Sequence, residues 1–216
     1  LMKKRYLLII LVIVVIIYFI STSFTPIIKK IADKEVNRFC RMIINNVELP
    51  VEVDHQKLVN IKRNGDSIAS INFDTSYAAD IGAKIVDELE KIFFEIEEGK
   101  YKKTNDSIYQ SKLEKVSNNN GIIASVHLGM LLNNPFLADF GPKINIRYKS
   151  ISAITSSLDK EIKSYGVNHM MISLTITIKI KLMVLVPFYD EEFNKSYDYP
   201  LIMEIIEGEV PNWYQN

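Results

Sequence analysis

Hydrophobic and polar residues follow three patterns in succession along the chain. No charged residue occurs from Tyr6 to Ile28, and Leu7 to Ile20 is almost continuous Leu, Ile, Val and aromatic. A helical period then dominates up to about residue 99, and a two-residue alternation dominates after residue 121. This order predicts an α+β fold, in which a single N-terminal transmembrane helix is followed by amphipathic helices packed on a mainly antiparallel β-sheet.

The apolar N-terminal run is long enough to cross a membrane, since about 20 residues span a hydrocarbon core of about 30 Å. We therefore expect a tail of residues 1–5 and a transmembrane anchor at 6–24. A cleavable secretory signal is the alternative, with a basic start and Ser21-Thr22-Ser23 near the cut. The length of the run and the lack of an A-x-A-like cleavage site favour the anchor.

The orientation of this anchor does not follow from charge alone, because basic residues flank both of its ends. A short tail before one span and a large domain after it is typical of a signal anchor. Long domains translocate largely regardless of their charge. We expect a single-pass membrane protein with a cytoplasmic N-terminus and an extracytoplasmic α+β domain at 25–216.

Residues 25–99 are predicted to form a helix, a hairpin and a second helix. Thr25-Pro26 offers a cap and a first-turn proline for a new helix, whose apolar stripe includes Cys40. We expect Cys40 to be a small buried hydrophobe rather than a reactive thiol. The pair Asn64-Gly65 favours a tight hairpin turn. Asp74 is the expected cap of the second helix, which ends at Gly99.

Each of the two helices also has a charged face with two interpretations. The basic face after Pro26 either contacts anionic lipid head groups or is simply solvated. The acidic face at 87–98 either attracts divalent cations or is solvated, and solvation is the ordinary explanation.

The C-terminal half is predicted to be mainly β at 121–216, after a polar connection at 100–120 that holds a short helix at 106–116. The longest strand candidate is "MISLTITIKIKLMVLVP", followed by a turn at "YDEEFN" and a returning strand. Its alternation gives one apolar face over a long distance. That face either rests on the two helices as a core, which the helices' own stripes favour, or cradles a hydrophobic ligand.

The segment "LLNNPFLADFGPK", from Leu131 to Lys143, is unusually apolar for a stretch that contains Asn-Pro and Gly-Pro. The two prolines predict a constrained bend between strands. Its Phe and Leu side chains then either plug one end of the core, which we favour, or form an exposed patch that contacts a partner or the membrane.

Composition and motifs exclude several classes of function. The 216 residues carry 26 basic and 26 acidic side chains, so no global field attracts nucleic acid. One cysteine excludes an intramolecular disulfide, and His55, His127 and His169 are scattered without a metal-binding spacing. The chain has no glycine-rich phosphate loop, and Asp190-Glu191-Glu192 falls in a predicted turn. We predict no catalytic residue, cofactor or metal site, and hence a non-enzymatic protein.

Several segments resemble the YunB family of sporulation proteins: "ADKEVNRFCRMIINNV", "LGMLLNNPFLADFGPKINI", "LVPF" and "GEVPNWY". The positions that carry the family motifs, with no known role, are Asn134, Pro135, Phe136, Gly141, Pro142, Lys143, Gly208, Glu209 and Pro211. The resemblance implies a role in spore formation, as a membrane protein made in the mother cell whose domain faces the space between the forespore membranes.

Pattern and resemblance together suggest a membrane-anchored protein of spore-envelope assembly that acts through protein or membrane interactions. Its expected partners are the membrane and either other spore-envelope proteins or further copies of itself. The alternative is a protein that binds lipid or another hydrophobic ligand at the forespore membranes. The identity of the partner and the oligomeric state do not follow from the sequence.

Overall fold

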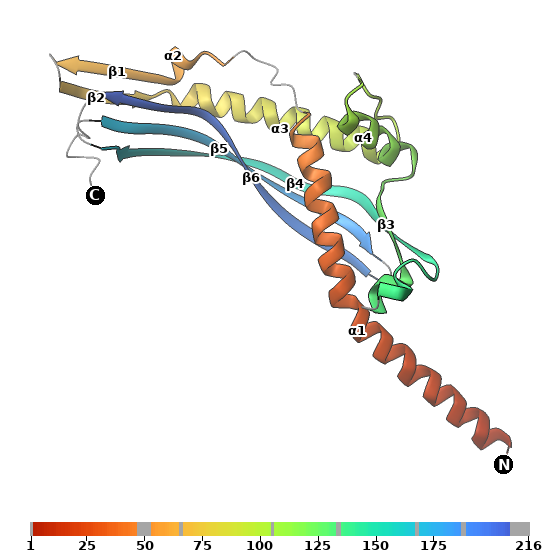
Figure 1. Ribbon diagram of the computed structural model, residues 1–216. Helices are drawn as coiled ribbons and strands as arrows, with labels where there is room; N and C mark the ends of the chain where they lie inside the picture. Colours follow the sequence, from red (N-terminus) through yellow and green to blue (C-terminus); the bar gives the residue numbers. More distant parts are fainter. Residues whose placement is uncertain are drawn as a thin grey trace.

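The computed structural model describes residues 2–46, 53–64, 67–104, 106–132, 135–166, 169–186 and 189–207, but not the side chains of residues 2–10, 12–23, 67, 135 and 189. The helices are α1 (Met2–Ile44), α2 (His55–Leu58), α3 (Thr75–Glu97) and α4 (Ile108–Asn118), with short 3-10 helices η1 (Leu128–Leu132) and η2 (Pro135–Leu137). The strands are β1 (Val59–Asn64), β2 (Ser67–Phe73), β3 (Ile122–His127), β4 (Lys143–Ser164), β5 (His169–Val186) and β6 (Tyr189–Glu207). Figure 1 shows an elongated molecule, with the N-terminal part of α1 projecting from one end and the β1–β2 hairpin at the other.

The main sheet has the strand order β3-β4-β5-β6, and every neighbouring pair is antiparallel. Strand β5 alternates as the sequence predicts, because its even-numbered residues from Met170 to Val186 are buried. The opposite face of the sheet is polar. There Thr177 Oγ1 lies 2.9 Å from a carboxylate oxygen of both Asp159 and Asp198. The sheet therefore has one face that must be covered.

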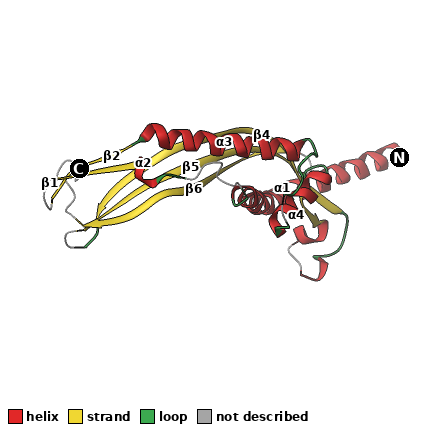
Figure 2. Cartoon of the chain, turned by 90° about the horizontal axis from the view of Figure 1, so that it is seen from above, coloured by secondary structure: helices red, strands yellow, loops and turns green. Residues whose placement is uncertain are grey.

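Three elements cover the apolar face. Helix α3 runs along the sheet on one side (Figure 2), mainly against β4, and α1 contacts β5 and β6. The β1–β2 hairpin closes the far end, where Ile68 and Ile71 pack with Met170, Ile172 and Ile206. In the part of the chain that the structure describes, the apolar face is thus a closed core. The ligand groove considered as an alternative is not present on it.

Helix α1 is one continuous helix with Pro26 inside it, so the new helix predicted at Thr25-Pro26 is wrong. A proline inside a helix removes one hydrogen bond and is a common cause of a kink. The axis of α1 changes direction along its length (Figure 1), and Phe24 and Ile27 on either side of the proline pack against the core. The packing of these two side chains therefore favours continuation of the helix through Pro26. Within the described residues, no helix reaches the length and apolar character that a membrane span requires.

The edge strand β6 is held to α1 by a row of polar contacts. Lys29 pairs with Glu191, and Asp33 accepts from Lys195 Nζ at 2.6 Å. One turn further on, the Tyr197 hydroxyl donates to Asn37 Oδ1 at 2.9 Å. Successive turns of the helix thus meet side chains on one face of the strand. Part of the basic face of α1 is ion-paired within the protein, which neither interpretation of that face anticipated.

The other local signals described in the first half of the domain are confirmed. Strands β1 and β2 form the predicted hairpin, with Asn64 opposite Ser67. Asp74 caps α3 by accepting from the Tyr77 N–H at 2.9 Å, and Gly99 follows the helix with a φ of 69°. Helix α4 occupies the short helix expected in the polar connection.

Three aromatic rings join α1, α3 and β4. Phe39 and Phe93 meet edge to face with centroids 5.9 Å apart, and Tyr148 lies 5.5 Å from Phe39 and 5.7 Å from Phe93. Both phenylalanines are fully buried. This junction is where both long helices and the sheet pack together.

Replacing Phe93 by Ala should destabilise the full chain in detergent micelles by about 3–5 kcal/mol, because it opens a cavity at the junction. The matched control is Phe94→Ala, since Phe94 is the next residue of α3 and is 56% exposed. That change should stay within about 0.5 kcal/mol. Denaturant unfolding followed by circular dichroism measures both values, and equal losses would contradict the described packing.

Candidate functional site

The apolar segment singled out in the sequence forms a loop between β3 and β4, named here the apolar loop (residues 128–132 and 135–142 of the described chain). Its ends meet at the ladder pair His127–Lys143. The Leu128 N–H donates to the Pro142 carbonyl at 3.0 Å, and the Gly129 N–H donates to the Phe140 carbonyl at 2.8 Å. The loop is therefore zipped shut at its base, between two paired strands.

Two glycines and one histidine fix its shape. A Cβ on Gly129 would lie 1.7 Å from the Leu137 carbonyl oxygen, so only glycine allows the two backbone segments to approach this closely. Gly141 has a φ of 89°, which L side chains rarely adopt. His127 donates from Nδ1 to the Gly141 carbonyl at 3.1 Å, and this gives that histidine a structural role. The conformation is thus set by backbone contacts.

Most large side chains of the apolar loop point outward. Leu131 alone among its large apolar side chains described here is buried, at 2% exposure. Phe136 is 89% exposed and Phe140 is 66% exposed. Met130, Leu132 and Leu137 are exposed as well. The expectation that the Phe side chains plug the core is therefore wrong, and Leu131 is the plug. The reason is that the two backbone segments at the base of the loop are hydrogen-bonded to each other, so the space between them holds no large side chain.

The apolar loop lies at the end of the sheet that adjoins α1. In Figure 1 it sits beside α1 near the point where the N-terminal part of that helix leaves the domain, and η1 contacts α1. The ends of β3 and β5 and the starts of β4 and β6 share this end of the sheet. The loop and the projecting helix are consequently neighbours.

The other motif positions divide into described and undescribed residues. Lys143 begins β4 and is exposed, and the carbonyl of Pro142 accepts the Leu128 hydrogen bond. Pro135 begins η2. Asn134, Gly208, Glu209 and Pro211 lie outside the described residues. No role for these four positions follows from the structure.

The candidate chemical groups do not converge. No group of His, Cys, Asp and Glu among the described residues is arranged to hold a metal ion. The predicted turn at Asp190-Glu191-Glu192 is wrong, because these residues lie in β6. Asp190 pairs with Lys149 at 2.8 Å and Glu191 with Lys29, so two of these carboxylates hold elements together.

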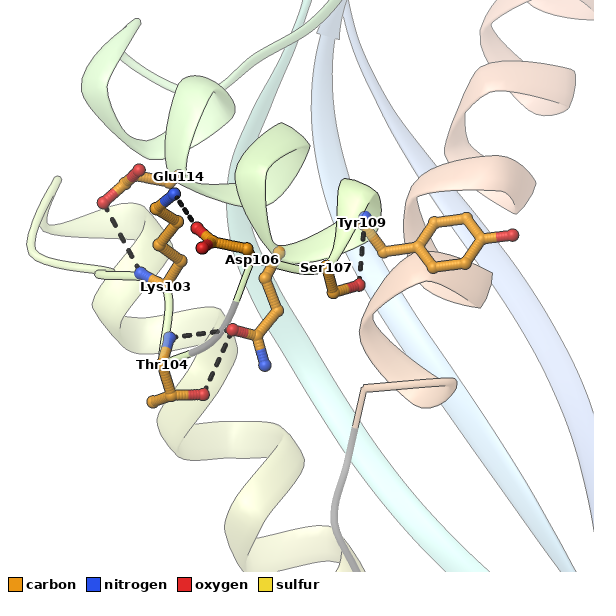
Figure 3. Close-up of polar contacts among 7 residues, drawn as sticks. Lys103, Thr104, Asp106, Ser107, Tyr109 and Glu114 are labelled. Atoms are coloured by element: carbon orange, nitrogen blue, oxygen red, sulfur yellow. Dashed lines mark hydrogen bonds and ion pairs between the residues drawn. The ribbon is translucent and has the colours of Figure 1, made fainter.

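A polar network at the start of α4 is a second candidate (Figure 3). Lys103 Nζ lies 2.6 Å from Asp106, and the buried Gln110 accepts from the Thr104 N–H at 2.7 Å. The Ser107 hydroxyl caps α4 by accepting from the Tyr109 N–H at 3.3 Å. The ion pair raises the pKa of Lys103 and lowers that of Asp106. Every one of these contacts is local, so the network orients the helix.

An open pocket of about 280 Å³ lies between α1, α4 and β3. Arg38, Lys112 and Lys115 line it above apolar side chains such as Phe39. Glu35 is 3.8 Å from Arg38 and offsets part of this charge. No sequence signal indicated this pocket, because its basic residues come from separate helices and follow no local motif.

Comparisons with known proteins show a likeness to one family. The family model described as Sporulation protein YunB matches residues 123–213. The Sporulation protein YunB of Bacillus subtilis (strain 168) is 24% identical to this chain over 202 residues, which make up 91% of the chain and 74% of that relative. The chain is therefore similar to the YunB family. No solved structure matches it.

The matched region has a clear place in the fold. Residues 123–213 include the apolar loop and the strands β4, β5 and β6, while α1, α3 and the β1–β2 hairpin precede it. The part of this chain that matches the YunB family is thus the sheet with its zipped loop. The elements that cover the sheet lie before residue 123, although the Bacillus subtilis relative aligns over most of the chain.

Cys40 is buried in α1, and burial raises the pKa of its thiol from the ordinary 9.0 to about 12. The folded thiol therefore stays protonated where the unfolded thiol ionises. We predict that the stability contributed by this group is complete below about pH 9 and is lost as the pH rises towards 12. Buried Tyr148 and half-buried Tyr197, whose pKa values are also raised, add to the loss at higher pH.

Denaturant unfolding at several pH values tests this linkage. Between about pH 8 and about pH 10, the wild-type chain should lose more stability than Cys40→Ala, because the variant lacks the thiol. A thiol reagent should modify Cys40 only as fast as the chain unfolds. Identical pH profiles, or rapid modification of the folded chain, would contradict a buried protonated thiol.

Proposed function

We propose that this chain is a membrane-anchored, non-enzymatic protein of sporulation whose domain acts through interactions with the membrane and with other proteins. The likeness to the YunB family supports the involvement in sporulation. The uncharged stretch from Tyr6 to Ile28 supports the anchor. The domain is expected on the extracytoplasmic side, at the forespore membranes.

The observation that carries the proposal is the contrast between a closed interior and an apolar loop exposed at one end. Interior side chains of β5 such as Ile176 and Leu182 are at most 1% exposed, so the core offers no room for a substrate. The polar groups described here form caps and ion pairs that hold elements together. The exposed loop is instead a surface suited to contact, and contact is the activity this architecture supports best.

The alternative of a hydrophobic-ligand protein is less well supported. It requires an open apolar face, and α1, α3 and the β1–β2 hairpin cover the face that the sequence suggested. Lipid remains a proposed partner through the apolar loop. Other spore-envelope proteins and further copies of the chain are the proposed protein partners.

Membrane fractionation tests the anchor. The full chain should stay in carbonate-washed membranes, whereas Val14→Arg with Val15→Arg should weaken retention. Each arginine at the centre of a span costs about 2.5–3.5 kcal/mol. The matched control is Ala79→Arg with Ala83→Arg, at two exposed positions of α3, which should be retained like the unaltered chain.

Release of the unaltered chain by carbonate would contradict the proposal. The sporulation role is measured separately, by the yield of heat-resistant spores when each variant replaces the natural protein. Both the arginine pair in the apolar stretch and loss of the gene should lower this yield, and the α3 control should not. A normal yield of heat-resistant spores without the gene would contradict the proposed role in sporulation.

A further inference from the structure

We infer that the apolar loop is a second membrane contact, which inserts its exposed side chains into the lipid interface beside α1. The inference rests on the membrane anchorage proposed above and adds a surface, an orientation and a partner to it. The partner is the bilayer that α1 crosses. Three observations support this assignment: the length of the apolar run, the position of the loop and the exposure of its large apolar side chains.

The length of the apolar run leaves no spacer between bilayer and domain. Residues 6–24 comprise 19 residues, and a helix of this length is about 28 Å long at about 1.5 Å per residue. A hydrocarbon core is about 30 Å thick. Phe24 and Ile27 already pack against the core of the domain, and α1 continues through both without a break. The domain is therefore seated directly on the membrane surface.

The apolar loop lies at the end of the domain that adjoins the bilayer in this arrangement. Its η1 helix contacts α1 at the end of the sheet from which the N-terminal part of α1 projects (Figure 1). A patch in this position meets lipid as soon as α1 crosses the bilayer. At the opposite end of the sheet, the exposed Met203 of β6 lies far along the strand from the loop and faces water.

The chemistry of the loop fits a lipid interface. Phe136 and Phe140 are large, exposed and carried by a loop whose base is closed by two backbone hydrogen bonds. A loop closed in this way loses less conformational freedom on insertion than an open one. Apolar side chains at an interface lie about 5–10 Å into the boundary between head groups and acyl chains. Exposed Asp139 lies within the loop and remains at the level of the head groups.

Two basic side chains near the loop are ion-paired within the protein. Lys29 pairs with Glu191 and Lys149 with Asp190 at the same end of the sheet. The charged side chain of the loop is exposed Asp139, and exposed Lys143, which follows the loop at the start of β4, offsets it. Attraction to anionic head groups is thus not the driving force. The driving force is the burial of apolar surface, and zwitterionic lipid is therefore sufficient for the contact.

Fluorescence in vesicles tests the inference with the full chain reconstituted in phosphatidylcholine. Trp213, the single tryptophan, is replaced by Phe, and a new tryptophan is introduced by Phe136→Trp or, as a second probe, by Phe140→Trp. The matched control is Met203→Trp, at a residue that is 70% exposed at the other end of the sheet. Circular dichroism checks that each variant is folded.

Both loop probes should emit at shorter wavelength than the control and lose intensity when the lipid is brominated near the head groups. The control should keep its intensity and be quenched by iodide in the water. Loop probes that iodide quenches as strongly as the control would overturn the inference. So would a blue-shifted emission that brominated lipid leaves unchanged, since it means that protein covers the loop.

These measurements test the membrane anchor and the loop contact separately. If carbonate releases the reconstituted chain, the anchor is wrong and the loop has no bilayer beside it. If the chain is retained but the loop probes behave like Met203→Trp, the anchor stands and the loop contact is wrong.

Discussion

The fold depends on covering the single apolar face of a long antiparallel sheet. Strand β5 places its even-numbered side chains on that face, and each Å² left in water would forfeit about 25 cal/mol. Helix α3, the hairpin and the C-terminal part of α1 share the task, and Phe39, Phe93 and Tyr148 join two of these elements to the sheet. Helix α1 is consequently part of the core and cannot serve as a loose tether.

This constraint gives α1 two roles in one rigid element. Its C-terminal part packs on the sheet and is held to the edge strand by Asp33, Asn37 and their partners, while its N-terminal part is uncharged from Tyr6 onward. In the proposed arrangement the orientation of the domain relative to the membrane is then fixed by packing, since no flexible linker intervenes. A zipped loop at the same end adds a second point of support.

Local signals predicted most of the fold, and the failures have non-local causes. Asp74, Gly99 and the alternation of β5 act through neighbours in sequence, and the predictions made from them are confirmed. Pro26 does not end α1, because packing of the flanking residues outweighs one lost hydrogen bond. Glu191 is in a strand because it pairs with Val184 of β5, and its side chain then meets Lys29 of α1. The exposure of Phe136 depends on the contact between Gly129 and the Leu137 carbonyl, which no spacing reveals.

Neutron reflectometry of the full chain in a supported bilayer tests the central claim most directly, because it resolves the layer between lipid and protein. If α1 runs without a break from the bilayer into the core, protein density should begin within the head-group layer and extend outward from it. A solvent layer between the head groups and the domain would contradict the account, since it would mean that α1 unfolds or lengthens into a spacer near Pro26.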